Sequence, residues 1–136
     1  MSKPELIVNK MMENDLFSQW MGIEIVEVSL GTCTLQMSVR EEMCNGFGVC
    51  HGGVQFSLAD SALAFSCNSH GMKTMSIEAS ISHFMTVHAG DLLTAKSEEV
   101  SKKNKISTYL IDIHNQKDEL VSQFKGMVYH SSKPWE

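Results

Sequence analysis

The chain has 136 residues, a net charge of −5, 43% hydrophobic residues and 20% charged residues. This length suits one domain with a core of its own, so we expect a single domain over residues 1–136, with residues 1–20 as an N-terminal helical segment. The acidic balance argues against nucleic-acid binding, which calls for a basic face. No run approaches the roughly 18 apolar residues of a membrane span, and no secretory signal opens the chain. We therefore expect a cytoplasmic protein that binds neither nucleic acid nor membrane.

The N-terminal residues carry clear helix signals. Ser2 can cap a helix, Pro4 suits its first turn, and Glu5 completes a capping box. Residues 15–20 predict a second short helical turn that ends at Gly22. Residues 23–29 and 32–40 then predict two strands joined by a turn at Gly31, because apolar and polar side chains alternate along the second of them.

A glycine-rich loop over residues 41–51 leads into an apolar helix over residues 52–70, which Gly71 ends. Four further strands are expected at 75–84, 91–101, 106–114 and 120–130, in an antiparallel meander. One long apolar helix and six strands pack most economically if a curved sheet wraps the helix. The predicted fold is therefore α+β, with an antiparallel sheet around one central helix.

Asp60 is the one formal charge between residues 45 and 71. An unpaired charge in an apolar setting costs several kcal/mol. Either Asp60 faces a solvent gap or bonds a hydroxyl such as Ser57 or Ser61, or it works as a general base or nucleophile whose reactivity rises where water is partly excluded. We favour the catalytic interpretation because perturbed carboxylates cluster at working sites.

His51, Gly52 and Gly53 stand where the apolar helix begins. The first amides of a helix lack intrahelical partners and carry the positive end of its dipole, so they suit a carbonyl oxygen that gains negative charge. Glycine also lets a substrate approach the backbone closely. The two glycines could equally serve only to let the loop turn into the helix.

Spacing separates these two candidate groups. Gly52 and Asp60 are about 12 Å apart along a helix, at 1.5 Å per residue, so one reacting carbonyl cannot touch both. If they cooperate, they come from different chains, as antiparallel helices across a two-fold axis would allow. The catalytic hypothesis therefore requires a dimer with two equal sites.

The stretch NGFGVCHGGVQFSLADSALAFSCNSHG, with Asn45, Gly52, Gly53 and Asp60, resembles the signature of the hotdog-fold thioesterases of the PaaI (phenylacetic acid degradation) type. The similarity extends over most of the chain from about residue 20. It implies hydrolysis of acyl-CoA thioesters, with aryl- or medium-chain acyl groups, in a homodimer or a dimer-of-dimers homotetramer. No cofactor is implied, because CoA is part of the substrate.

The resemblance also implies roles for individual residues. The Gly52 amide would polarise the thioester carbonyl, and Asp60 of the partner chain would activate water or attack directly. Asn45 would hold the nucleophile or the loop, His51 would orient the site, and Ser76 would assist near the acid. Lys102, Lys103 and Lys105, on a predicted hairpin tip, would bind the phosphates of CoA, unless they are only a solvated turn.

Several alternatives stay open. A hotdog module that binds acyl-CoA without hydrolysing it, and a hotdog hydratase or dehydratase, would share most of these features. Cys50 could be a nucleophile, although only the adjacent His51 could pair with it. The four cysteines and His51 do not have the spacing of a zinc site, so we expect no metal and free thiols, with Cys33 and Cys67 in the core. The histidines outside the motif are expected at the surface or its boundary: His83, His88, His114 and His130.

Overall fold

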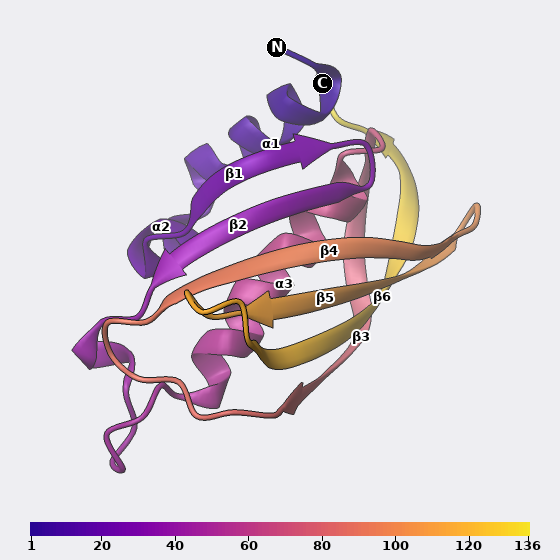
Figure 1. Ribbon diagram of the computed structural model, residues 1–136. Coiled ribbons are helices and arrows are strands. Elements are labelled where there is room, and N and C mark those ends of the chain that lie inside the picture. Colours follow the sequence, from indigo (N-terminus) through magenta and orange to yellow (C-terminus); the bar gives the residue numbers. More distant parts are fainter.

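In the computed structural model, which describes residues 1–136, a six-stranded antiparallel sheet curves around one long helix (Figure 1). The helices are α1 (Lys3–Asn14), α2 (Leu16–Met21) and α3 (Gly52–Asn68), with a 3₁₀ turn at Glu41–Met43. The strands are β1 (Glu24–Ser29), β2 (Thr32–Ser38), β3 (Met72–His83), β4 (Leu92–Lys102), β5 (Ile106–His114) and β6 (Leu120–Pro134). The predicted order of elements and the wrapped helix are confirmed.

The N-terminal helices form for the reasons that the sequence suggested. The Ser2 side chain accepts a hydrogen bond from the Glu5 N–H, and the Glu5 carboxylate accepts one from the Ser2 N–H, so the capping box is present. Asp15 caps α2 by accepting from the Ser18 N–H, and Gly22 ends that helix in the left-handed conformation, with φ 74°. None of the helices is both long enough and apolar enough to span a bilayer.

The prediction of a four-strand meander is wrong for β3. The order across the sheet is β1-β2-β4-β5-β6-β3, so β4 to β6 form a meander, β4 pairs with β2, and β3 pairs only with β6. The reason lies in residues 84–91, which pass the N-terminal end of α3. There the Cys50 N–H donates to the Val87 carbonyl and the Gly90 N–H donates to the Val39 carbonyl. Because of these bonds, the chain reaches the end of β2 after β3, and the next strand, β4, pairs with β2 instead of with β3.

Helix α3 is buried around most of its circumference, as its apolar sequence predicts. Leu58, Ala62 and Phe65 are fully buried, and Phe56 meets Phe124 of β6 edge to face at 5.1 Å between ring centroids. Cys33 and Cys67 lie in the core, and all four cysteines are free thiols. The residues of α3 that are not fully buried are Gly52, Gly53, Val54, Phe56, Ser57, Asp60 and Ala64. Among them, Gly53, Ser57, Asp60 and Ala64 follow at helical spacing and form a narrow stripe along one face.

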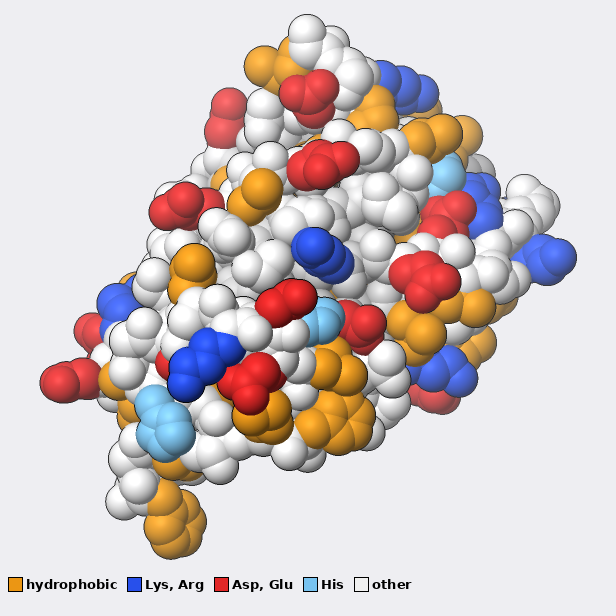
Figure 2. Space-filling view, viewed as in Figure 1, with side chains coloured by type: hydrophobic (Ala, Val, Ile, Leu, Met, Phe, Trp, Pro, Cys, Tyr) orange, Lys and Arg blue, Asp and Glu red, His pale blue; other side chains and the backbone are white.

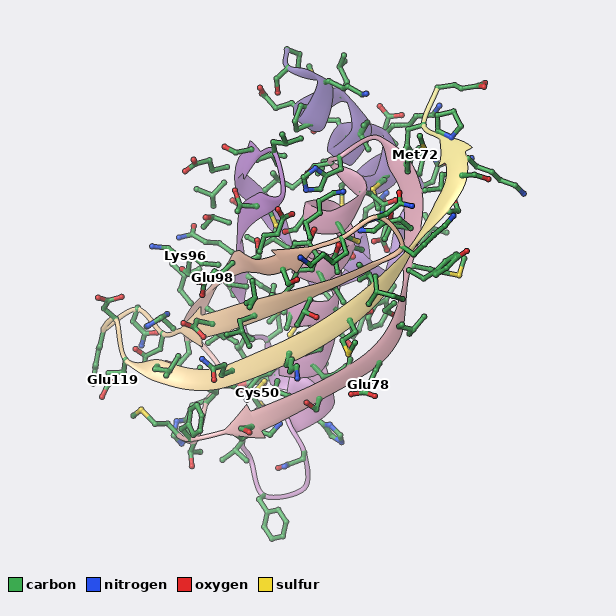
Figure 3. All side chains as sticks on the ribbon, turned by 90° about the vertical axis from the view of Figure 1, so that its right-hand side faces the viewer. Cys50, Met72, Glu78, Lys96, Glu98 and Glu119 are labelled. Carbon is green, nitrogen blue, oxygen red and sulfur yellow. The ribbon has the colours of Figure 1, made fainter.

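Strand β3 forms an exposed edge of the sheet. It ends the strand order and pairs with β6 alone. In Figure 3 it runs beside β6, from the labelled Met72 past Glu78. Met75 and Ile77 are 69% and 55% exposed, although their side chains are apolar. The outer face over β1, β2, β4 and β5 instead carries interspersed acidic and basic side chains (Figure 2).

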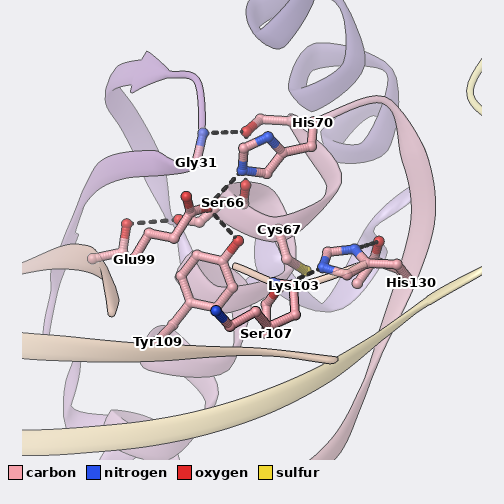
Figure 4. Close-up of polar contacts among 12 residues, drawn as sticks. Gly31, Ser66, Cys67, His70, Glu99, Lys103, Ser107, Tyr109 and His130 are labelled. Carbon is pink, nitrogen blue, oxygen red and sulfur yellow. Dashed lines mark hydrogen bonds and ion pairs between the residues drawn. The ribbon is translucent and has the colours of Figure 1, made fainter. Parts of the chain in front are cut away.

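Polar contacts tie the C-terminal end of α3 to the sheet (Figure 4). His70 Nε2 lies 2.5 Å from Glu99 Oε2, and the Tyr109 hydroxyl donates to the same oxygen. His130 lies between the Ser107 and Thr74 hydroxyls, 2.6 and 2.9 Å from its ring nitrogens. The expectation of a surface or boundary position is wrong for His130, which is 5% exposed because its neighbours satisfy both ring nitrogens inside the sheet.

A close approach between α3 and the sheet generates a stability prediction. A Cβ on Gly126 of β6 would lie 2.6 Å from Leu63 Cδ2 of α3. Gly126→Ala should therefore lower the free energy of unfolding by about 1–3 kcal/mol, through overpacking. Chemical denaturation measures this. Gly46→Ala is the matched control, since nothing lies within 4 Å of that position, and equal effects of the two substitutions would contradict the prediction.

Candidate active site

The N-terminus of α3 presents a free backbone donor at Gly52. His51 is the N-cap, and its Nδ1 accepts a hydrogen bond from the Gly53 N–H at 3.0 Å. The Val54 N–H donates to the His51 carbonyl. The Gly53 and Val54 amides therefore both have His51 as their acceptor. The Gly52 N–H has no partner within the chain. A helix-terminal amide without a partner is the kind of donor that stabilises a developing oxyanion.

The His83 ring crowds the position where a side chain of residue 52 would begin. A Cβ there would lie 3.1 Å from His83 Nε2, and His83 Nδ1 in turn lies 3.2 Å from Gln55 Oε1. Gly52, Gln55 and His83 line a cavity of about 390 Å³ together with Val49, Cys50 and residues 84–87. The His83 ring therefore forms the wall opposite the helix N-terminus.

Asn45 shapes the loop that precedes α3. Its Oδ1 accepts hydrogen bonds from the Phe47 and Val49 N–H groups, at 2.9 and 3.4 Å, and its own N–H donates to the Val49 carbonyl. These bonds are those of an Asx turn. The side-chain oxygen is thus engaged within the loop, while the side-chain NH₂ forms no hydrogen bond within the chain.

Asp60 lies at the middle of α3, half-buried and unpartnered. Its two neighbouring hydroxyls are engaged elsewhere: Ser57 donates to the Gly53 carbonyl, and Ser61 bonds Ser18. No ion pair reaches the Asp60 carboxylate. Burial, reinforced by the nearby negative charge of Asp15, raises the pKa of Asp60 above its usual value. An unpaired carboxylate of raised pKa has the basicity that proton abstraction from water requires.

The carboxylate opens into a cavity of about 600 Å³ between α3, β3 and β6. Ser76 of β3 lines the same cavity, so the structure brings these two predicted site residues together. Asn45, His51 and Gly52 gather instead at the N-terminal end of α3. Since α3 is continuous from Gly52 to Asn68, Gly52 and Asp60 are about 12 Å apart along its axis. The two groups line different cavities.

The three lysines predicted to bind phosphates lie apart from both cavities. Lys102 ends β4, and Lys103 and Lys105 form the tip of the hairpin to β5. The Lys105 ammonium lies 5.9 Å from the Tyr129 ring centroid, and the Lys105 carbonyl accepts from the His130 N–H. The turn is thus anchored to β6 through its backbone.

The geometry disfavours Cys50 as a nucleophile. Its side chain is 5% exposed, and burial together with the neighbouring Cys44 raises the pKa of its thiol to about 11. The thiolate, which is the reactive form, is therefore scarce at neutral pH.

Three residues of these cavities were not singled out from the sequence: Gln55, His83 and Trp135. Gln55 does carry a signal, because it is a buried polar residue one turn after Gly52 in an apolar helix. His83 and Trp135 carry none, since strand pairing and the path of the C-terminus bring them to the cavities.

The helix cap at His51 yields a second prediction. His51→Ala removes the acceptor of the Gly53 N–H and should lower the free energy of unfolding by about 1 kcal/mol. His51→Asn keeps a side-chain acceptor at the cap and should restore most of this loss. Thermal or chemical unfolding of both variants tests the cap, and equal stability of His51→Ala and the unsubstituted protein would refute it.

Comparison with known proteins agrees with this geometry. The family model of the thioesterase superfamily matches residues 47–122. The acyl-coenzyme A thioesterase PaaI of Escherichia coli is 37% identical, over 85% of this chain and 83% of its own length. The solved structure of E. coli PaaI superposes with a TM-score of 0.95, at 33% identity, over 97% of this chain and 96% of that one. A variant of the phenylacetic acid degradation protein PaaI of Thermus thermophilus has a TM-score of 0.83, at 26% identity, over 86% of this chain and all of that one (100%).

The family match begins at the loop before α3 and runs through both candidate groups, Gly52 and Asp60, into β6. The chain belongs to the thioesterase superfamily and, within it, is a hotdog-fold thioesterase of the PaaI type.

Proposed function

We propose that the protein hydrolyses acyl-CoA thioesters to free acid and CoA at two equivalent sites, each combining Gly52 of one protomer with Asp60 of its partner. The observation that carries the proposal is the position of these groups on α3. A free helix-terminal amide and an unpartnered carboxylate lie on one rigid helix, about 12 Å apart, and line different cavities. Two antiparallel copies of α3 would unite each amide with a carboxylate.

Two surfaces support such a dimer. The exposed stripe of α3 contains small side chains around Asp60, so a second copy of the helix could approach closely. Strand β3 has an unpaired edge along its 12 residues and exposes apolar side chains such as Met75 and Ile77. An unpaired edge of this kind is a template for strand addition. Both surfaces lie beside the Asp60 cavity, so one two-fold axis could use them together.

The proposed chemistry follows from the contacts of each group. The Gly52 N–H has no competing acceptor within the chain and would donate to the thioester oxygen as negative charge develops there. The Gly53 N–H is already bonded to His51. Gly53 would therefore contribute only by letting the substrate approach the backbone closely. His51 would orient the Gly52 N–H, because it fixes the first turn of α3. Asn45 holds the loop beside this amide.

Asp60 acts on the opposite face of the carbonyl. Its carboxylate takes a proton from the water that attacks the carbonyl carbon, and the tetrahedral intermediate collapses with cleavage of the C–S bond. Alternatively, the carboxylate attacks the carbonyl carbon itself, CoA leaves by the same cleavage, and water then hydrolyses the acyl anhydride to release the acid and restore Asp60. The CoA thiolate leaves and takes up a proton. Ser76 shares the cavity with Asp60 and would hydrogen-bond the water or the carboxylate.

The remaining assignments concern CoA and assembly. Lys102, Lys103 and Lys105 would meet the CoA phosphates as point charges from the β4–β5 hairpin. A pair of dimers would form the homotetramer. Leu16, Phe17 and Trp20 of α2 are each more than half exposed and offer a second apolar surface for that contact.

Replacing Asp60 tests the proposal. Asp60→Asn is nearly isosteric and should lower kcat for CoA release by about 10²–10⁴-fold, because it removes the general base or nucleophile. Free-thiol detection across a panel of acyl-CoAs measures this. Wild-type turnover in the folded variant would overturn the proposal. Tight acyl-CoA binding without thiol release by the unsubstituted protein would instead identify a binding module.

The pH dependence has a definite sign. Asp60 works as the carboxylate, and burial raises its pKa. The rate should therefore fall as the pH is lowered through a pKa above that of an ordinary aspartate. A pH profile of kcat/KM measures the position of this limb. A limb at the ordinary aspartate value would contradict the environment described for Asp60.

A further inference from the structure

The Asp60 cavity extends well past the carboxylate. Its walls include Leu63, Ala64 and Cys67 of α3, Met75 of β3 and Val128 of β6, all of which are apolar. Asn68, at the C-terminal end of α3, and Trp135, near the end of the chain, also line it. The cavity therefore runs along the C-terminal half of α3, from a carboxylate toward a tryptophan.

The chain fixes Trp135 in place. Its indole Nε1–H donates to Asn68 Oδ1 at 2.8 Å, and its backbone N–H donates to the Gly71 carbonyl at 2.8 Å. Asn68 is itself 3% exposed, and its side-chain amide donates to the carbonyls of Ala64 and Thr74. The indole is thus attached to a rigid buried side chain, although it belongs to the C-terminal segment.

The two lysines at this cavity do not make it a charged pocket. Lys73 and Lys133 line it, but both are exposed to solvent. The Lys73 ammonium lies 5.1 Å from the centroid of the Trp135 ring and so packs on the indole. The neutral, apolar walls beside α3 favour a hydrocarbon over a charged acyl group.

We infer that Trp135 forms the end of the acyl pocket and sets the length of the acyl chain, which makes saturated medium-chain acyl-CoAs the preferred substrates. This inference rests on the proposed function, because Asp60 must mark the reacting carbon. Asp60 and Asn68 are eight residues apart, or about 12 Å along the helix. An extended polypeptide advances about 1.2 Å per backbone bond, and we take the same value for an extended acyl chain. Roughly ten bonds of the acyl chain would then fill the distance. An acyl group of about eight to ten carbons would reach the indole, and an aryl-acetyl group would leave the distal half empty.

A chain-length profile tests the inference. We expect kcat/KM of the unsubstituted protein to peak at octanoyl- to decanoyl-CoA and to fall for tetradecanoyl-CoA. Trp135→Ala should raise the ratio of kcat/KM for tetradecanoyl- over octanoyl-CoA by about tenfold or more, because each methylene in an apolar pocket contributes measurably to discrimination. Trp135→Phe keeps a ring and should change this ratio much less.

Trp20→Ala provides the matched control. Trp20 is the other tryptophan of the chain, 54% exposed on α2 and stacked near Phe17 and Arg40, outside the cavity. Its removal should leave the chain-length profile unchanged. The inference is overturned if Trp135→Ala and Trp20→Ala give the same profile, or if the unsubstituted protein prefers phenylacetyl-CoA to every straight chain.

A binding measurement separates this inference from the proposed function. In a Trp20→Phe background, Trp135 is the single tryptophan, and its fluorescence should change on titration with the non-hydrolysable thioether S-decyl-CoA but not with CoA. This readout needs neither turnover nor a Trp135 substitution that could disturb folding. Calorimetric binding of S-decyl-CoA without a fluorescence change, or no binding at all, would refute the acyl pocket. If the fluorescence responds while Asp60→Asn retains turnover, the proposed function fails and the pocket stands.

Discussion

The rise of an α-helix is the constraint on which this structure depends. Gly52 and Asp60 stand eight residues apart on a continuous helix, and a helix cannot bend enough to bring them to one carbonyl. The free amide of Gly52 and the unpartnered carboxylate of Asp60 therefore cannot act together on one carbonyl within a single chain. In the proposed dimer, the exposed edge of β3 and the small-residue stripe of α3 share one explanation, because both would lie where a second copy supplies the missing half.

The wrapped helix explains the unusual composition around these groups. Because the sheet covers α3 on most sides, nearly all of its residues are apolar or small, and a charge is tolerated only on the stripe that the sheet leaves open. The raised pKa of Asp60 has a thermodynamic consequence. A carboxyl whose pKa is higher in the folded than in the unfolded state stabilises the fold below its unfolded pKa, and this contribution is lost as the pH rises through the folded pKa. At neutral pH the ionised Asp60 thus works against stability.

Local signals predicted much of this structure. Three features depend only on residues that are close together in the sequence: the capping box at Ser2, the left-handed Gly22 and the apolar run of α3. The structure has each of them where it was expected. The position of β3 could not be predicted in this way, because its partner β6 is chosen by the path of residues 84–91 across the end of α3.

The candidate site also contains residues that local sequence signals predicted and residues that only tertiary packing brings together. Asn45, His51, Gly52 and Asp60 fall in one short stretch, so spacing alone related them. His83 reaches Gly52 from the end of a strand, and Trp135 reaches Asn68 from the end of the chain. Such contacts depend on tertiary packing and leave no periodic pattern in the sequence. The burial of His130 has the same origin, since its partners Ser107 and Thr74 come from two other strands.

Complementation between two inactive variants tests the shared site most directly. Asp60→Asn and Gly52→Val chains can be co-expressed with different affinity tags, and the mixed dimer isolated by tandem purification. If each site combines Gly52 of one protomer with Asp60 of its partner, the mixed dimer contains one intact site and one doubly defective site, and it should show about half the acyl-CoA hydrolysis of the unsubstituted dimer. A mixed dimer as inactive as its two parents would contradict the shared site.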